Sequence, residues 1–314
     1  MNSTKLGIEY LPKPFWKTTS TDIISIKERR IGVIDGPISR RFFDYFDEYK
    51  NFTTENDEYS TNTHSAIVSS IIKDIYLPSK LYVTQVECGG GNDSEESMVK
   101  ALEWLVIDKK IEIVNISLGF YNNCKGDCLW DKRFKKLNDI YNVIIVVSGG
   151  NTNESHKNDS ISCPGCAKTA ITVGALNLEF NIDKEMNLKP IPELKKPDIY
   201  ANGYINITMF DGYVWNVWKF SGTSFSSPII VGLIAKYYDE IVQTPEFPQI
   251  KNFLSSIDLF LNKKGLYNEK DKIKEIFKPK LKALEKENSC YLNKENIISF
   301  LTELTPIKEK KATM

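Results

Sequence analysis

The stretch KFSGTSFSSPIIVGLIAKYY (residues 219–238) contains a helix that reads as wholly buried and yet begins with small polar residues. Apolar residues between positions 229 and 235 face every side of the helical wheel, which is typical of a helix in the centre of a domain. Pro228 suits a first turn, because the N–H that proline lacks would have no partner inside the helix there. One interpretation is a well-capped core helix. The other is that Ser224 is a nucleophile beside free backbone N–H groups that can hold an anion.

Upstream of this helix, short apolar runs alternate with helical patterns. We predict helices over 64–75, 94–109 (with Ser94 as its N-cap) and 131–141, and strands over 30–35, 80–87, 111–119, 143–150 and 170–176. This alternation of Val/Ile-rich runs and helices predicts an α/β fold with a mostly parallel sheet covered on both faces. Functional residues of such sheets gather at the carboxyl ends of the strands. Asp35, Gly119 and Asn151 lie at or just beyond such ends, so we expect a site there.

A serine nucleophile needs a base to take its proton and a third group to orient that base. The chain has only two histidines. His156 lies in a polar loop, and we interpret it as merely exposed. His64 opens an apolar helix, and its order after Asp35 and before Ser224 makes these three residues the candidate constellation.

Between about residues 30 and 240 the sequence resembles the subtilases, the subtilisin-like serine proteases. SGTSFSSP (221–228) resembles the nucleophile motif of that family, Gly-Thr-Ser-x-Ala-x-Pro, with Ser226 at the usual Ala position. Four further segments resemble parts of that family. IGVID (31–35) resembles the aspartate strand, and VNISLG (114–119) the substrate-binding strand. VVSGGN (146–151) resembles the segment of the oxyanion Asn, and CPGCAKTAITVGA (163–175) the following pocket wall. The resemblance implies the subtilisin-like three-layer fold, with a mostly parallel sheet between helices.

The resemblance and the chemistry of the side chains imply the same catalytic roles. Ser224 is the expected nucleophile, and His64 would take its proton and later donate it to the leaving amine. Asp35 would orient the imidazole and stabilise its charged form. Asn151 would donate its side-chain N–H to the developing oxyanion, together with the backbone N–H of Ser224.

The resemblance also implies that Ser117, Leu118, Gly119 and Phe120 bind substrate. In the family this strand pairs with the backbone of the substrate and frames the pocket for the residue before the cleaved bond. Phe120 stands where the family usually has a second Gly. We therefore expect a narrowed or redirected pocket, and selectivity for few sequences over general digestion.

Two further positions depart from the family pattern. Asp35 is followed by Gly-Pro (36–37) instead of Ser/Thr-Gly, a variant that looks like that of subtilases maturing ribosomally made peptides, such as the cyanobactin proteases. His64 is followed by Ser-Ala (65–66) instead of Gly-Thr, so the Gly beside the base is missing. We expect a slightly displaced His64 and modest turnover.

The chain has six cysteines, and four of them form two close pairs, Cys124 with Cys128 and Cys163 with Cys166. A four-thiolate zinc site, disulfides and small buried residues are all open interpretations. The segment between the pairs is longer than the usual spacing of a zinc ribbon. We therefore assign no metal ligand and expect no cofactor, although in a subtilase fold both pairs would border the substrate pocket and could brace it.

The composition argues against several classes of partner. Lysines plus arginines equal the acidic residues, 41 against 41, so neither nucleic acid nor an anionic membrane is indicated as the main partner. No apolar run is long enough to span a membrane, and the N-terminus lacks the hydrophobic stretch of a secretion signal. We expect a cytoplasmic protein that acts on a peptide or protein. The first core strand begins too close to the N-terminus to leave room for a folding pro-domain. We therefore expect narrow substrate specificity to protect other proteins from cleavage.

We divide the chain into an N-terminal extension (1–29), a subtilisin-like catalytic domain (30–245) and a C-terminal helical extension (246–314) packed on it. The leading hypothesis is a serine endopeptidase that works through an acyl-enzyme and removes the leader of a precursor peptide. One alternative is a peptide macrocyclase, in which an amine instead of water resolves the acyl-enzyme. The other is a pseudoprotease that binds peptides without cutting them.

Overall fold

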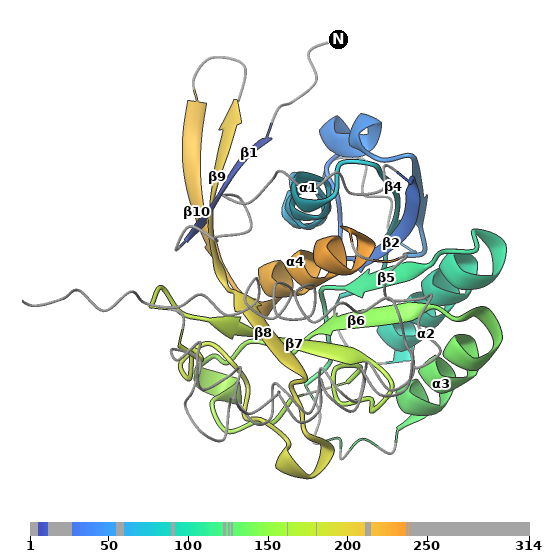
Figure 1. Ribbon diagram of the computed structural model, residues 1–314, viewed down its shortest axis with the longest axis vertical. Helices are drawn as coiled ribbons and strands as arrows, with labels where there is room; N and C mark the ends of the chain where they lie inside the picture. The colour runs from blue at the N-terminus through green and yellow to red at the C-terminus, as the bar shows by residue number, and fades with distance from the viewer. Residues whose placement is uncertain are drawn as a thin grey trace, which may run out of the picture.

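A seven-stranded parallel sheet forms the centre of the fold, in the order β3-β4-β2-β5-β6-β7-β8 (Figure 1). The computed structural model describes residues 6–11, 27–54, 60–88, 92–121, 124, 126, 128–161, 163–179, 181–210, 215–236 and 238. The strands of this sheet are β2 Arg29–Asp35, β3 Glu48–Asn51, β4 Ser79–Gln85, β5 Ile113–Ile116, β6 Ile144–Ser148, β7 Ile171–Leu176 and β8 Ile199–Asn202. The predicted α/β fold with a parallel sheet is confirmed.

Helices cover both faces of this sheet. Figure 1 shows α1 (His64–Ile75) and α4 (Thr223–Lys236) on one side, and α2 (Asn92–Glu103) and α3 (Leu129–Tyr141) on the other. Neighbouring strand residues serve opposite faces, because side chains alternate along a strand. Val33 packs in the cluster with α1 and α4, whereas Ile34 packs in the cluster with α2 and α3. None of the helices in the described ranges is long and apolar enough to cross a membrane.

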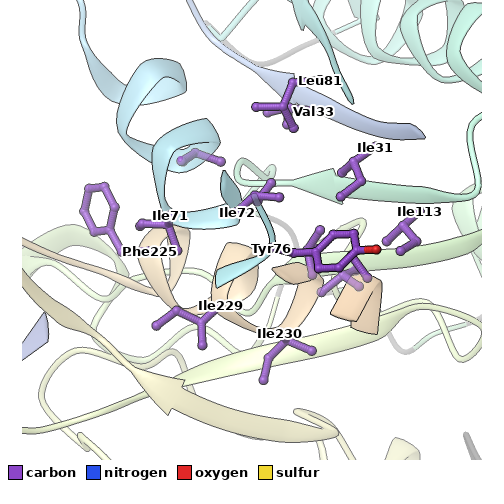
Figure 2. Close-up of a cluster of buried hydrophobic side chains, with 14 of the residues drawn as sticks. Ile31, Val33, Ile71, Ile72, Tyr76, Leu81, Ile113, Phe225, Ile229 and Ile230 are labelled. Carbon is purple, nitrogen blue, oxygen red and sulfur yellow. The ribbon is translucent and has the colours of Figure 1, made fainter. Parts of the chain in front are cut away.

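Helix α4 is buried on all sides, as its sequence predicts. Figure 2 shows Ile71 and Ile72 of α1 lying between that helix and α4, from which Ile229 and Ile230 extend into the same cluster. Each such side chain contributes about 1.5–3 kcal/mol when fully buried. A helix packed on every side is a rigid support, and Ser224 in its first turn is one of its few residues that are not buried.

A second, three-stranded antiparallel sheet has the order β1-β9-β10 and was not predicted from the sequence. Its strands are β1 Leu6–Leu11, β9 Tyr204–Phe210 and β10 Trp215–Ser221. β1 comes from the predicted N-terminal extension and pairs with β9 along its whole length. β10 runs directly into Gly222 and α4, so this sheet leads the chain to Ser224 (Figure 1).

Several predicted boundaries differ from the structure. α2 begins at Asn92, so Ser94 lies inside the helix, buried at 1% exposure, and its predicted role as N-cap is wrong. The helix ends at Glu103 and continues as a π-helical segment, Trp104–Asp108. Short 3-10 helices span Arg40–Tyr45, Glu154–His156 and Pro192–Leu194. The predicted C-terminal helical extension (246–314) lies outside the described residues.

Candidate active site

A carboxylate and an imidazole meet at the carboxyl end of β2. Asp35 is the last residue of that strand and is only 3% exposed, and His64 is the first residue of α1. Nδ1 of His64 lies 2.9 Å from each carboxylate oxygen of Asp35. The backbone N–H of Gly36 donates to Oδ1 of Asp35 at 2.7 Å. These contacts fix the carboxylate and the ring plane, and they leave Nε2 of His64 to face a reactant.

Two opposing effects set the pKa of His64. Burial lowers it, because a poorly solvated site disfavours the charged imidazolium. The negative charge and hydrogen bond of Asp35 raise it, and the net result is a pKa above the ordinary 6.5. A raised pKa makes the imidazole a better proton acceptor, which suits a group that takes and returns a proton.

Ser224 lies in the first turn of α4, close to this pair. The ring of its neighbour Phe225 is 5.3 Å from the ring of His64, measured between centroids. The Ser224 hydroxyl donates to the carbonyl of Ser117 at 3.1 Å, and among the described residues it forms no hydrogen bond with His64. Because a hydroxyl has one proton, it must leave the Ser117 carbonyl before it can donate to Nε2. Such catalytic hydrogen bonds often form only when substrate is bound.

Asn151 lies against the residues that precede Ser224. Its Oδ1 accepts the backbone N–H of Thr223 at 2.8 Å and the hydroxyl of Thr223 at 3.0 Å. That hydroxyl in turn accepts the N–H of Gly150 at 3.1 Å. Because Oδ1 is held by Thr223, the amide N–H₂ of Asn151 points away from Thr223, and it donates to no residue that the structure describes.

A second free donor lies beside Asn151. The backbone N–H of Ser224 belongs to the first turn of α4, where amides have no partner inside the helix. Gly222 has a φ of +150°, and a Cβ there would come within 3.0 Å of Nδ2 of Asn151. Glycine is therefore required at 222, and the two donors can serve one developing oxyanion.

The predicted substrate-binding residues follow β5. The Ser117 hydroxyl donates to the backbone carbonyl of Ser224 at 3.0 Å, which ties this segment to α4. Leu118 and Gly119 make no backbone hydrogen bond to any other residue that the structure describes, so their N–H and C=O groups are open to an added strand. Phe120 is held differently: its N–H donates to the carbonyl of Cys163 at 2.7 Å, and its ring stacks on Trp130 with centroids 6.5 Å apart.

The missing glycine after His64 is accommodated in the structure. Ser65 is fully buried, and its hydroxyl donates to the carbonyl of Gly36 at 3.2 Å. The expected displacement of His64 therefore does not disturb its contact with Asp35. Modest turnover stays a prediction.

Two features near the site escaped the sequence reasoning. Thr223 holds Asn151, and only the fold reveals a contact across such a long stretch of chain. His156, interpreted as merely exposed, is only partly so: its Nδ1 lies 2.7 Å from a carboxylate oxygen of Asp159, and its ring stacks on Tyr121 at 3.6 Å. The Tyr121 hydroxyl donates to the carbonyl of Asn151 at 2.9 Å. Tyr121 directly follows the predicted substrate-binding residues 117–120, and an aromatic residue at this position was the sequence signal for a contact near the site.

The two cysteine pairs lie together next to the predicted substrate-binding residues 117–120, here called the substrate segment, with which Cys163 shares a hydrogen bond to Phe120. The sulfur atoms of Cys124, Cys128, Cys163 and Cys166 all lie within 4.8 Å of one another. This is the group of side chains in the described ranges that can hold a metal ion.

Known proteins resemble the chain in sequence. The model of the subtilase family (peptidase S8) matches residues 30–251. Subtilisin DY of Bacillus licheniformis is 22% identical over 256 residues, which cover 76% of this chain and 88% of that protein. Alkaline protease 2 of Aspergillus fumigatus is 26% identical over 202 residues, covering 60% of this chain and 39% of its own length.

Solved structures show the same fold. The prenylagaramide maturation protease PagA superposes with a TM-score of 0.55 at 22% identity, over 71% of this chain and 81% of that one. A lanthipeptide protease superposes with a TM-score of 0.54 at 16% identity, over 73% of this chain and 78% of that one.

Proposed function

Because the chain belongs to the subtilase family and is a serine protease, we propose that it cleaves peptide bonds with Ser224, His64 and Asp35. The observation that carries this assignment is the contact of His64 with both oxygens of Asp35, at 2.9 Å, beside the first turn of α4. A buried carboxylate that orients an imidazole toward a hydroxyl at a helix N-terminus is the arrangement that nucleophilic catalysis by serine needs.

The proposed reaction has two halves. Nε2 of His64 takes the Ser224 proton as Oγ attacks the substrate carbonyl, and the resulting imidazolium donates that proton to the leaving amine. Water then attacks the acyl-enzyme and gives one proton to His64, which returns that proton to Oγ of Ser224 as the ester bond breaks and the acid leaves. The oxyanion of each half accepts the N–H of Ser224 and the side-chain N–H of Asn151, and losing one such donor costs about 100- to 1,000-fold in rate.

We propose a precursor peptide as the substrate. The open backbone groups of Leu118 and Gly119 suit an extended segment that adds as a strand. The names of two structural neighbours, a prenylagaramide maturation protease and a lanthipeptide protease, support such a role. Phe120 at a position where the family usually has Gly supports selectivity over general digestion, so casein should be degraded poorly.

Labelling with a fluorophosphonate probe tests the assignment. The wild type should form an adduct on Ser224, and Ser224→Ala and His64→Ala should lose it. Lys136→Ala, on the exposed face of α3, is the control and should leave labelling unchanged. An adduct that survives Ser224→Ala, or a folded wild type that stays unlabelled, contradicts the proposal.

Product mass then distinguishes the fate of the acyl-enzyme. Hydrolysis adds one water to the two fragments of a leader–core peptide, whereas cyclisation of the core adds none. We expect linear fragments, each carrying its share of that water, and a cyclic product would contradict the assignment as a hydrolase.

A further inference from the structure

Four cysteines from two distant loops converge beside the substrate segment. Cys124 and Cys128 lie between β5 and α3, whereas Cys163 and Cys166 lie between β6 and β7. Cys163 and Cys166 are buried, and Cys124 and Cys128 are partly so. Small apolar residues would fill the same space, so packing alone does not explain four thiols at one point.

The distances between the sulfurs do not describe disulfides. The Sγ atoms of Cys163 and Cys166 are 3.2 Å apart, and those of Cys128 and Cys166 are 3.8 Å apart. A disulfide bond is about 2.05 Å long. None of these four cysteines forms a disulfide in this structure.

The same distances do fit a tetrahedral metal centre. With zinc–sulfur bonds of about 2.3 Å, the sulfurs of a regular tetrahedron lie roughly 3.8 Å apart. The sulfurs of Cys163 and Cys166, 3.2 Å apart, would move slightly apart, and sulfurs separated by up to 4.8 Å would move closer, each by about 1 Å or less. Soft thiolate ligands in tetrahedral geometry select zinc over the oxygen-seeking magnesium and calcium ions.

Two backbone features favour thiolates at this point. Cys128 is the N-cap residue of α3, where the positive end of the helix dipole stabilises a negative charge. The N–H of Gly126 donates to the sulfur of Cys124 at 3.3 Å. Gly126 has a φ of +83°, and a Cβ there would strike Leu194, so the chain folds tightly around that sulfur.

We propose that Cys124, Cys128, Cys163 and Cys166 bind one structural zinc ion. Four protein ligands complete a tetrahedral shell, so the ion has no open position for substrate and does not take part in the reaction.

The ion would brace the substrate pocket, an effect that rests on the proposed function. The carbonyl of Cys163 accepts the N–H of Phe120, and Phe120 stacks on Trp130, which lies in the first turn of α3 after Cys128. Zinc therefore joins the two loops on either side of Phe120. Its removal should loosen this wall while Asp35 and His64, on β2 and α1, keep their contact.

Metal content of the purified full-length protein, prepared without a metal-affinity tag, tests the proposal. We expect one zinc per chain by elemental analysis and the same mass increase in native mass spectrometry. Replacing zinc by cobalt should give the visible absorption of a tetrahedral cobalt–thiolate centre. Cys128→Ser and Cys166→Ser should each lose the metal, whereas Cys88→Ser, the matched control outside the cluster, should keep it.

Measurements on the wild type alone can overturn the proposal, so the test holds even if the variants fail to fold. A wild type without metal, whose denatured mass lacks two hydrogens for each disulfide, would show a disulfide cluster instead. A wild type without metal and with all thiols reactive would show a thiol cluster, and iron in place of zinc would refute the metal assigned. Fluorophosphonate labelling of Ser224 in such a metal-free protein would leave the protease assignment standing.

Discussion

Thr223 links Asn151 to the backbone of the nucleophile turn. Its hydroxyl donates to Oδ1 of Asn151 and accepts the N–H of Gly150, and the residue is fully buried. Thr223→Val keeps the shape but removes both hydrogen bonds, so Asn151 should turn more freely before it meets the oxyanion. We expect kcat to fall roughly five- to tenfold, equivalent to about 1 kcal/mol, with little change in KM.

The conservative variant separates positioning from packing. Thr223→Ser retains the hydroxyl and should keep kcat near the wild-type value, although it loses a buried methyl group. If Thr223→Val turns over as fast as the wild type, Asn151 does not depend on Thr223 for its orientation.

The pH dependence of kcat/KM should report the raised pKa of His64. Asp35 stabilises the imidazolium, so His64 stays protonated to a higher pH than a free imidazole with its pKa of 6.5. Only the neutral ring can accept the Ser224 proton. Activity should therefore fall as the pH is lowered through a midpoint above 6.5, and a midpoint at or below 6.5 would refute this reading. His156→Gln should not move the midpoint.

Stability should show the opposite trend with pH. A pKa that is higher in the folded than in the unfolded state means that the folded chain binds the proton more tightly. The protonated His64–Asp35 pair thus stabilises the fold below pH 6.5, and this contribution is lost as the pH rises through the folded pKa. His64→Gln should lower the free energy of unfolding more at pH 5.5 than at pH 9, as measured by urea unfolding.

The residue types of the site could be predicted, but not all of their contacts. A serine at one helix start, a histidine at another and an aspartate at the end of a strand are local patterns, and the strand order brings all three to one edge of the sheet. The contact of Thr223 with Asn151 depends on how β6 and α4 pack. The hydrogen bond of Ser224 to Ser117 instead of His64 depends on one torsion angle, which no sequence pattern encodes.

At the scale of elements, α1 and α4 pack closely at Gly232. Gly232 of α4 faces Ile75 of α1, and a Cβ at 232 would lie 2.7 Å from the Cβ of Ile75. Alanine favours a helix over glycine by about 0.8–1 kcal/mol, whereas overpacking a core costs about 1–3 kcal/mol. We therefore expect Gly232→Ala to be destabilising by about 1 kcal/mol.

Urea unfolding measures this balance directly. Lys136→Ala on the exposed face of α3 is the control, and it should change the midpoint little. A higher midpoint for Gly232→Ala would mean that helix propensity prevails and that the two helices separate at little cost.

The strands that the sequence revealed are those buried on both faces. β2, β4, β6 and β7 are buried along nearly their whole length, and all four were predicted within two residues of their bounds. The sequence missed β1, β3, β8, β9 and β10: β8 is buried but only four residues long, and β10 exposes the adjacent Val217 at 61% and Trp218 at 55%. β5 was predicted too long, since its last predicted residues, 117–119, lie beyond the end of the strand at Ile116.

At the scale of the whole molecule, the two sheets are consecutive parts of one path to the nucleophile. β8 is the last strand of the parallel sheet, β9 and β10 follow it, and β10 leads into α4. The N–H of Gly222 donates to the carbonyl of Gly203 at 2.9 Å, so the residue after β10 contacts the residue before β9. The position of Ser224 thus depends on elements from both ends of the described chain.

The N-terminal strand is therefore expected to be part of the catalytic unit and not a dispensable extension. Deleting residues 1–11 removes β1, which pairs with β9 from Leu6 opposite Met209 to Leu11 opposite Tyr204 (Figure 1). β9 and β10 would remain as an isolated hairpin, which is marginally stable in water, and β9 would have an unpaired edge. We expect a lower urea midpoint, concentration-dependent association by light scattering and slower fluorophosphonate labelling of Ser224.

Deleting only residues 1–5 leaves β1 intact and should keep all three properties at their wild-type values. If the chain without residues 1–11 unfolds at the same urea concentration, associates no more than the wild type and labels at the same rate, β1 adds nothing to the unit. The catalytic domain would then begin at β2, as the sequence alone predicts.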